Sequence, residues 1–174
     1  GLFKLIQADL TRTRVSQLAI DTVCNFEART DVPLDVVRSG SLLMARTPEH
    51  ARMIQHEAEQ SRAWGVEVDM VDETTARALM PVIEGTGFSA ICHIPGDIYI
   101  EEPRALIDAW LAALKLKKVD VLGHAPVTGI TTSSGRVTGV ETPHGTIAAP
   151  IVVDAAGAWA RMLATASLSL GNDP

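Results

Sequence analysis

The sequence predicts an α/β fold, and three patterns along its 174 residues support that prediction. Helical periodicity dominates the first part of the chain. Short strands separated by turns follow between 119 and 149, with good hairpin signals. The run 151–153 is apolar at every position, as in a strand covered on both faces, and it leads into another helical segment. The chain is therefore expected to combine packed helices, hairpins and one buried strand.

Composition and charge exclude several functional classes. Hydrophobic residues make up 47% of the chain, which is normal for a protein that buries a core. The 15 lysines and arginines against 21 acidic residues give a net charge of −6, which would repel a nucleic-acid backbone. The most apolar window, 147–160, is broken by Pro150 and Asp154 and is shorter than the roughly 20 residues of a membrane span. Neither nucleic acid nor a membrane span is expected.

The two cysteines and the first residues suggest a compartment. Cys24 and Cys92 stand far apart, in no metal or redox spacing, so both are interpreted as ordinary buried thiols. The opening segment contains Lys4 and Asp9 and so lacks the apolar core of a secretory signal. A reducing cytoplasm is the expected location.

Three helices are expected before residue 119. A long amphipathic helix, with room for an interruption, should run from about Phe3 to Arg29. Thr47 and Pro48 form a helix start, and that helix should end at Gly65. Another should begin at Pro103. The expected inward-facing residues of the three helices are Val15, Leu18, Ala19, Val23 and Phe26; Ala51, Ile54, Ala58 and Ser61; and Leu106, Ile107, Trp110, Leu111 and Leu114.

Extended segments are expected between these helices. The patterns predict strands at 36–46, 66–71 and 87–94. A capped helical turn is expected at 72–80 and a tight turn at 95–97.

Side-chain chemistry is sparse. The segment 56–60, HEAEQ, lacks the second histidine of a zinc-protease helix, and no metal site is expected. No G-x-S-x-G elbow occurs, and Cys92 and His93 are strand neighbours whose side chains should point to opposite faces. The acidic group Asp97, Glu101 and Glu102 suits a general acid or base, but a turn before a helix also attracts carboxylates for capping alone.

The corner IVVDAAGAWA at 151–160 has two interpretations. Small residues between a strand and a helix let the backbone approach a ligand, and a helix N-terminus favours an anionic group such as a pyrophosphate. Small residues also occur there because a helix and a sheet must pack closely, and a full G-x-G-x-x-G is missing. The decapeptide alone does not decide between them.

Four segments occur in an informative order. They are GSLLMA at 40–45, PGDIYIEEPRALIDAW at 95–110, PVTGI at 126–130 and RVTGVETPHGTIAAPIVVDAAGAWA at 136–160. Each is weakly specific, but their succession covers nearly the whole chain and resembles the D-amino acid oxidase family. This flavoprotein group includes glycine oxidase, sarcosine oxidase, and the sarcosine and dimethylglycine dehydrogenases.

The resemblance implies a particular α/β organisation, namely part of a FAD-binding Rossmann-like domain interwoven with part of an antiparallel-sheet substrate domain. The cofactor part is expected at 1–31 and 103–174, and the substrate part at 32–102. In such a protein the glycine-rich unit that binds the ADP of FAD would precede Gly1, and the rest of the substrate domain would follow Pro174. The chain alone is then expected to be inactive and not to retain FAD.

The resemblance also implies a short set of cofactor-binding positions. Val127 matches the position whose main chain meets the adenine of FAD. Ala155, Ala156 and Gly157 match the segment that passes close to the diphosphate and ribose, and Trp159 packs the helix start beneath it. These are mainly main-chain roles, and no catalytic residue is expected within the chain.

The implied activity is oxidation of a secondary amine or amino acid, such as glycine, sarcosine or a D-amino acid, by hydride transfer to FAD. Two alternatives stay open: a non-catalytic binding or assembly subunit, and a related flavoenzyme acting on a glycerol phosphate or a 2-hydroxy acid. An uncovered sheet edge at 151–153 would favour self-association, for example as a homodimer. One departure from the family is Lys118, where a glycine usually ends the helix, so this lysine must tolerate a left-handed conformation or the helix must end otherwise.

Overall fold

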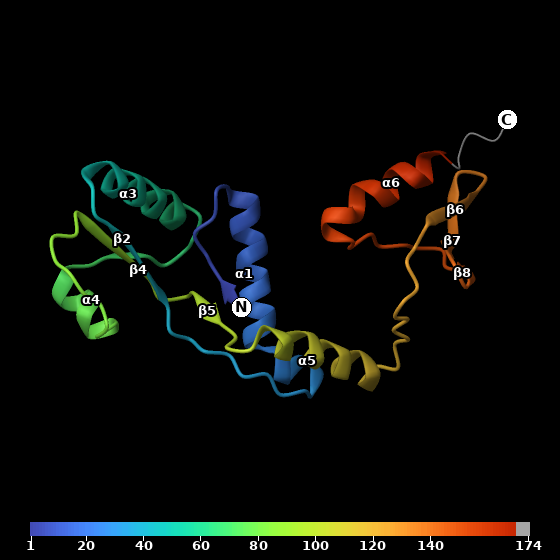
Figure 1. Cartoon of the computed structure of the whole chain (residues 1–174), viewed down its shortest axis with the longest axis horizontal. Helices are drawn as coiled ribbons and strands as arrows, with labels where there is room; N and C mark the ends of the chain where they lie inside the picture. The colour runs from blue at the N-terminus through green and yellow to red at the C-terminus, as the bar shows by residue number, and fades with distance from the viewer. Residues whose placement is uncertain (170–174) are drawn as a thin grey trace. The chain divides into compact units, whose positions relative to one another are not determined.

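The computed structural model describes residues 1–169 in two compact units, Gly1–Val119 and the described part of Asp120–Pro174 (Figure 1). Each unit combines helices with antiparallel strands, so the predicted mixture of the two is confirmed. None of the described helices is long and apolar enough to cross a membrane. Residues 170–174, the end of the expected cofactor part, lie outside the described residues.

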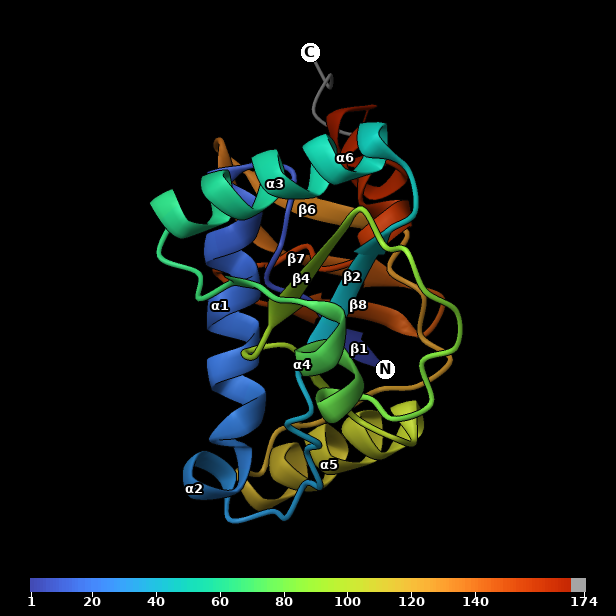
Figure 2. The same ribbon diagram turned by 90° about the vertical axis from the view of Figure 1, so that its left-hand side faces the viewer.

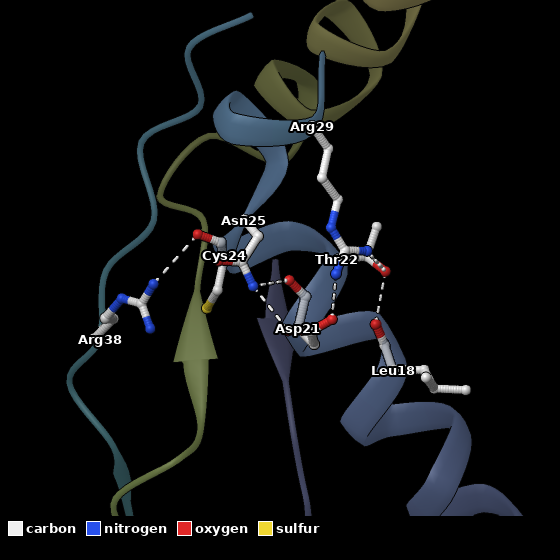
Figure 3. Close-up of polar contacts among 7 residues, drawn as sticks. All are labelled: Leu18, Asp21, Thr22, Cys24, Asn25, Arg29 and Arg38. Atoms are coloured by element: carbon white, nitrogen blue, oxygen red, sulfur yellow. Dashed lines mark hydrogen bonds and ion pairs between the residues drawn. The ribbon is translucent and has the colours of Figure 1, made fainter. Parts of the chain in front are cut away.

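The first expected helix begins later than predicted and is interrupted. Strand β1 (Leu2–Phe3) and a loop come first, then α1 (Leu10–Cys24) and α2 (Phe26–Thr30). The interruption falls at Asn25, whose side-chain amide donates to the carbonyl and carboxylate of Asp21. Arg29 also pairs with the Asp21 carboxylate, so polar contacts span the junction between the two helices (Figure 3).

The sheet of the first unit consists of β2 (Ser41–Ala45), β4 (Ala90–Ile94) and β3 (Asp69–Met70), all antiparallel. The three expected strands therefore form, but each is shorter than predicted. A two-stranded ribbon joins β1 to β5 (Ile98–Tyr99), directly after the predicted turn.

Helix α3 (Pro48–Ala63) lies against β2 and β4 (Figure 2). Its start is as predicted, since the Thr47 hydroxyl accepts a hydrogen bond from the His50 N–H at 3.3 Å. Its end is as predicted as well, since Gly65 has a φ of +81°. All four expected inward residues are buried, and three of them join the largest hydrophobic cluster. The predicted helical turn is α4 (Glu73–Leu79), which Asp72 caps.

The inward faces predicted for the other two helices were partly wrong. In α5 (Pro103–Leu116) the buried residues are Ala109 and Ala113, which pack with Phe26 of α2. The expected core residues that are exposed instead are Val15 and Leu18 of α1, and Ile107, Trp110 and Leu111 of α5. Periodicity determines which residues share a helix face, but a neighbouring element decides which face is covered.

The end of α5 explains the departure at Lys118. This residue adopts the left-handed conformation, with a φ of +57°. Its N–H donates to the carbonyl of Lys115, and the N–H of Val119 donates to the carbonyl of Leu114. These are the two hydrogen bonds of a Schellman motif, in which glycine is the usual left-handed residue. The helix therefore ends in a Schellman motif, with a lysine in the position that glycine usually occupies.

The second unit is a three-stranded antiparallel meander, and the predicted hairpins are confirmed. Strands β6 (Gly129–Ser133), β7 (Arg136–Thr142) and β8 (Gly145–Ala148) pair in sequence order. After them come the short 3-10 helix η1 (Gly157–Trp159) and α6 (Ala160–Ser169), which lies against β6.

The buried strand predicted at 151–153 does not form. These residues belong to no strand, and the side chains of Ile151 and Val153 are 79% and 83% exposed. A strand requires a neighbour that supplies hydrogen bonds, and none of the described strands pairs with this segment. An apolar run therefore marks a segment suited to burial, without ensuring that a partner covers it.

Candidate functional site

A cavity of about 620 Å³ lies in the second unit, where the chain before β6 faces the start of α6. Four of the five expected cofactor-binding residues line it: Val127, Ala155, Ala156 and Trp159. The fifth, Gly157, adjoins this lining as the first residue of η1. Positions almost 30 residues apart in sequence are thus brought together around one space.

The meander positions Val127. The main-chain N–H of Thr128 donates to the carbonyl of Glu141 at 2.9 Å, which holds the segment against the end of β7. The main chain of Val127 has no hydrogen-bond partner within residues 1–169. Its N–H and C=O are therefore available to a planar ligand with a donor and an acceptor on one edge.

The corner before α6 is shaped by Asp154, whose Oδ1 accepts a hydrogen bond from the N–H of Ala156 at 2.9 Å. Ala155 has no main-chain partner in the described part of the chain. Gly157 has a φ of +58°, which favours glycine, and a Cβ built there would meet nothing within 4 Å. The corner therefore offers small side chains and open main-chain groups next to the start of a helix, where anionic groups are favoured.

The remaining described lining is almost entirely apolar, and sequence reasoning missed it. Val140, Met162 and Leu163 contribute side chains, and Asp154 is the one charged residue among the described lining. Trp159 and Met162 are three apart on consecutive turns, so helical spacing would have placed them together. Val140 could be found only from the register of β7. An apolar cavity with a few polar groups is typical of a cofactor or ligand site.

The residues considered for catalysis have structural roles. Burial raises the pKa of the Cys92 thiol, which packs within the main hydrophobic cluster. Asp97 is buried and accepts hydrogen bonds from the Leu5 N–H at 2.8 Å and the Ser41 hydroxyl at 2.6 Å. Glu102 caps α5, as expected of a carboxylate before a helix. Cys24 is only half-buried, which corrects its interpretation as a buried thiol.

The described part of the chain contains no group of side chains that could bind a metal ion. Within residues 1–169, no three His, Cys, Asp or Glu side chains lie close enough together to hold a metal ion.

The chain is similar in sequence and in fold to several known proteins. The chain is 37% identical over 105 residues to glycine oxidase of Pseudomonas putida, covering 60% of this chain and 28% of that protein. It is 28% identical over 139 residues to human mitochondrial sarcosine dehydrogenase, covering 77% of this chain and 15% of that protein. The structure of L-proline dehydrogenase from P. horikoshii matches with a TM-score of 0.81 and 20% identity, covering 93% of this chain and 42% of that one.

The chain thus spans less than half the length of each of these proteins. A family described as "DAO: FAD dependent oxidoreductase" matches residues 4–173. The cofactor of this family is FAD, and the fold, the cavity in the second unit and the order of the sequence motifs are consistent with it. The chain belongs to the DAO family of FAD-dependent oxidoreductases.

Proposed function

We propose that the cavity of the second unit holds the adenosine and diphosphate part of FAD. One observation carries this proposal: the open main chain of Val127 and the small residues Ala155 and Ala156 line the same space. Val127 would orient the adenine, and the corner would let the diphosphate pass close to the backbone. FAD would supply the redox chemistry, while these residues bind and orient it.

Filling the cavity with a larger side chain tests whether it is the cofactor site. In the complete gene product, Ala156→Phe should weaken FAD binding by at least about tenfold, because the ring would occupy space that the cofactor needs. Ala112→Phe, on the exposed face of α5, is the matched control and should bind FAD as the parent does. A titration of apoprotein with FAD, followed by flavin fluorescence, measures both. Equal affinities of the two variants for FAD would contradict the assignment of this cavity as the FAD site.

We further propose that the complete protein oxidises a secondary amine or amino acid of the glycine, sarcosine or D-amino acid type. The similarity to glycine oxidase and sarcosine dehydrogenase supports this class. Hydride would leave the α-carbon for the flavin, and the imine would hydrolyse. The present chain is proposed to be inactive alone, and no catalytic residue within it is named.

Anaerobic mixing separates this activity from the alternatives. Glycine, sarcosine or a D-amino acid should bleach the flavin band of the purified complete protein. Bleaching only by glycerol phosphate or a 2-hydroxy acid would replace the proposed substrate class. A protein that binds no flavin and is bleached by none of these compounds would be a non-catalytic binding subunit.

The domain assignment stays a proposal, with 1–31 and 103–174 on the cofactor side and 32–102 on the substrate side. A cytoplasmic location is likewise proposed and is supported by the free thiols of Cys24 and Cys92. The apolar segment 151–153 is exposed, which supports self-association. Light scattering should detect dimers or larger species of the isolated chain, and a monodisperse monomer would contradict this.

A further inference from the structure

A loop of the first unit, residues 81–88, joins α4 to β4 (Figure 2) and takes no part in the flavin proposal. Residues 84–87 of this loop are all exposed. Main-chain hydrogen bonds of Ile83 and Ser89 flank the segment, but within residues 1–169 none joins the main chain of 84–88 to another main-chain group. This part of the loop is therefore held to the unit by side chains.

The carboxylate of Glu73, in the first turn of α4, holds the end of the loop. Its Oε1 accepts hydrogen bonds from the N–H groups of Gly87 at 2.7 Å and Phe88 at 3.0 Å. Hydrogen bonds to an ionised acceptor are stronger than those between neutral groups. Glu73 therefore fixes two successive main-chain groups of the loop to α4.

The guanidinium of Arg77, one helical turn later, holds the middle of the loop. It donates to the carbonyl of Ile83 at 2.5 Å and to the carbonyl of Gly85. Its Nη2 also lies 3.6 Å from Oε2 of Glu73. The two side chains are 35% and 33% exposed, so water competes for their charges and the pair stabilises the loop only weakly.

Apolar contacts hold the same loop from its inner side. Ile83 is 9% exposed and clusters with Ala76 and Ile91, and Phe88 packs against that cluster. The guanidinium of Arg46 lies 5.5 Å from the centre of the Phe88 ring. This small cluster is distinct from the main hydrophobic cluster, which lies between α3 and the sheet.

We propose that residues 81–88 form a strap that opens and closes as one unit, with Glu73 and Arg77 as its latch. The hydrogen bonds of the latch all end on the main chain of the strap, so breaking them leaves the sheet paired. Gly85 and Gly87 have φ values of +83° and +77°, and glycine lets the chain turn there without a steric penalty. The open state uncovers the small cluster and involves no flavin.

Amide hydrogen exchange of the 174-residue chain tests whether the strap opens by itself. The amides of Gly87 and Phe88 should exchange at least about 100-fold faster than the protected amides of α3, because strap opening requires no unfolding of the sheet. Low urea concentrations should scarcely change the strap rates, since a local opening exposes little surface. Equal rates and equal urea dependence in the strap and in α3 would overturn the proposal, because opening would then be global unfolding.

Alanine substitutions test the latch. Glu73→Ala and Arg77→Ala should each accelerate exchange of the strap amides by at least about tenfold and leave α3 unchanged. Alanine keeps the helical propensity of α4 high, so the helix itself is retained. The matched controls Glu59→Ala and Arg52→Ala lie at exposed positions of α3 and should leave the strap rates as in the parent. Strap rates that do not change, or that rise together with those of α3, would show that the pair is no latch.

Arg77→Lys separates charge from geometry. Lysine keeps the positive charge, but its ammonium group lacks the planar fork with which arginine reaches two carbonyls. This variant should therefore open the strap nearly as much as Arg77→Ala does. A glutamate-specific protease supplies an independent measurement, since cleavage after Glu84 requires an open strap and should be several-fold faster in the latch variants than in the controls. Cleavage and exchange as in the parent for Arg77→Lys would overturn the assigned hydrogen-bond latch.

Discussion

The two units of the chain differ in how they are held together. All the buried hydrophobic side chains found in the described structure lie in the first unit, from Leu5 to Ala113, in four clusters. In the second unit, the buried positions among residues 120–165 are Gly129 and Gly139. The first unit is therefore stabilised by side-chain packing, and the second mainly by its hydrogen-bonded meander.

This difference indicates which unit offers a surface suited to binding a cofactor. A packed unit offers rigid walls, whereas the second unit leaves apolar side chains such as Trp159 of η1 and Met162 of α6 exposed around a cavity. An apolar surface of this kind is suited to a large cofactor that completes the packing. Four changes, ordered from the largest expected effect to the smallest, test the contrast.

Truncating one apolar side chain in each unit should give the widest difference. Ile94→Ala removes a buried side chain from the main cluster and should destabilise the first unit by about 2 to 5 kcal/mol. Val153→Ala, at an exposed position, should change stability by less than about 0.5 kcal/mol. Urea unfolding followed by circular dichroism measures both. Similar losses would show that the second unit has a core of its own.

The second unit should nevertheless be sensitive at one tight contact. A Cβ at Gly139 would lie 2.2 Å from the carbonyl oxygen of Ile147, so Gly139→Ala must push β7 and β8 apart. A loss of about 1 to 3 kcal/mol is expected. Gly123→Ala, with nothing within 4 Å of its Cβ, is the control. Amide hydrogen exchange of 145–148 should accelerate in the first variant only, and unchanged exchange there would refute the contact.

Relieving backbone strain should stabilise the first unit. Lys118 is left-handed, a conformation that disfavours a side chain, so Lys118→Gly should add about 1 kcal/mol. Lys117→Gly, one residue earlier with a φ of −81°, should instead lower stability by about 0.5 to 1 kcal/mol. No backbone strain is relieved at that position, and the glycine only increases the conformational freedom of the unfolded chain. Thermal melting compares the pair. A loss in both variants would contradict the strain argument.

The smallest effect is a local response to acid near α4. Hydrogen bonds from the N–H groups of Phe88 and Gly87, helped by Arg77, lower the pKa of Glu73 below its ordinary value of 4.5. Because its pKa is lower in the folded state, ionised Glu73 contributes to the stability of the fold at pH values above its unfolded-state pKa. That contribution to stability is lost as pH falls through the folded-state pKa. The pH range over which this stability is lost therefore lies below 4.5.

Nuclear magnetic resonance can follow this titration directly. The amide shifts of Gly87 and Phe88 should move together with a midpoint below 4.5. Glu73→Gln should remove that transition, and Glu59→Gln, on the outer face of α3, is the control that should keep it. A midpoint at or above 4.5 would contradict the hydrogen-bonding argument.

Local signals predicted much of the fold. The Thr47 cap, Pro48 and Gly65 define the ends of α3 correctly, because capping chemistry acts within a few residues. The turns between β6, β7 and β8 were predictable for the same reason. The order of motifs further identified the family, and four of the five positions that the resemblance implied line the cavity of the second unit.

The sequence by itself thus determined the ends of α3, the hairpins, the family and the cofactor. Only the tertiary structure decided which apolar faces are covered, as the exposed Ile107 and Val153 demonstrate. It also brought Asp97 of the β4–β5 turn together with Leu5 and Ser41, which donate hydrogen bonds to its buried carboxylate. Burial depends on neighbours that are distant in sequence, and a local pattern carries no information about whether such a neighbour is present.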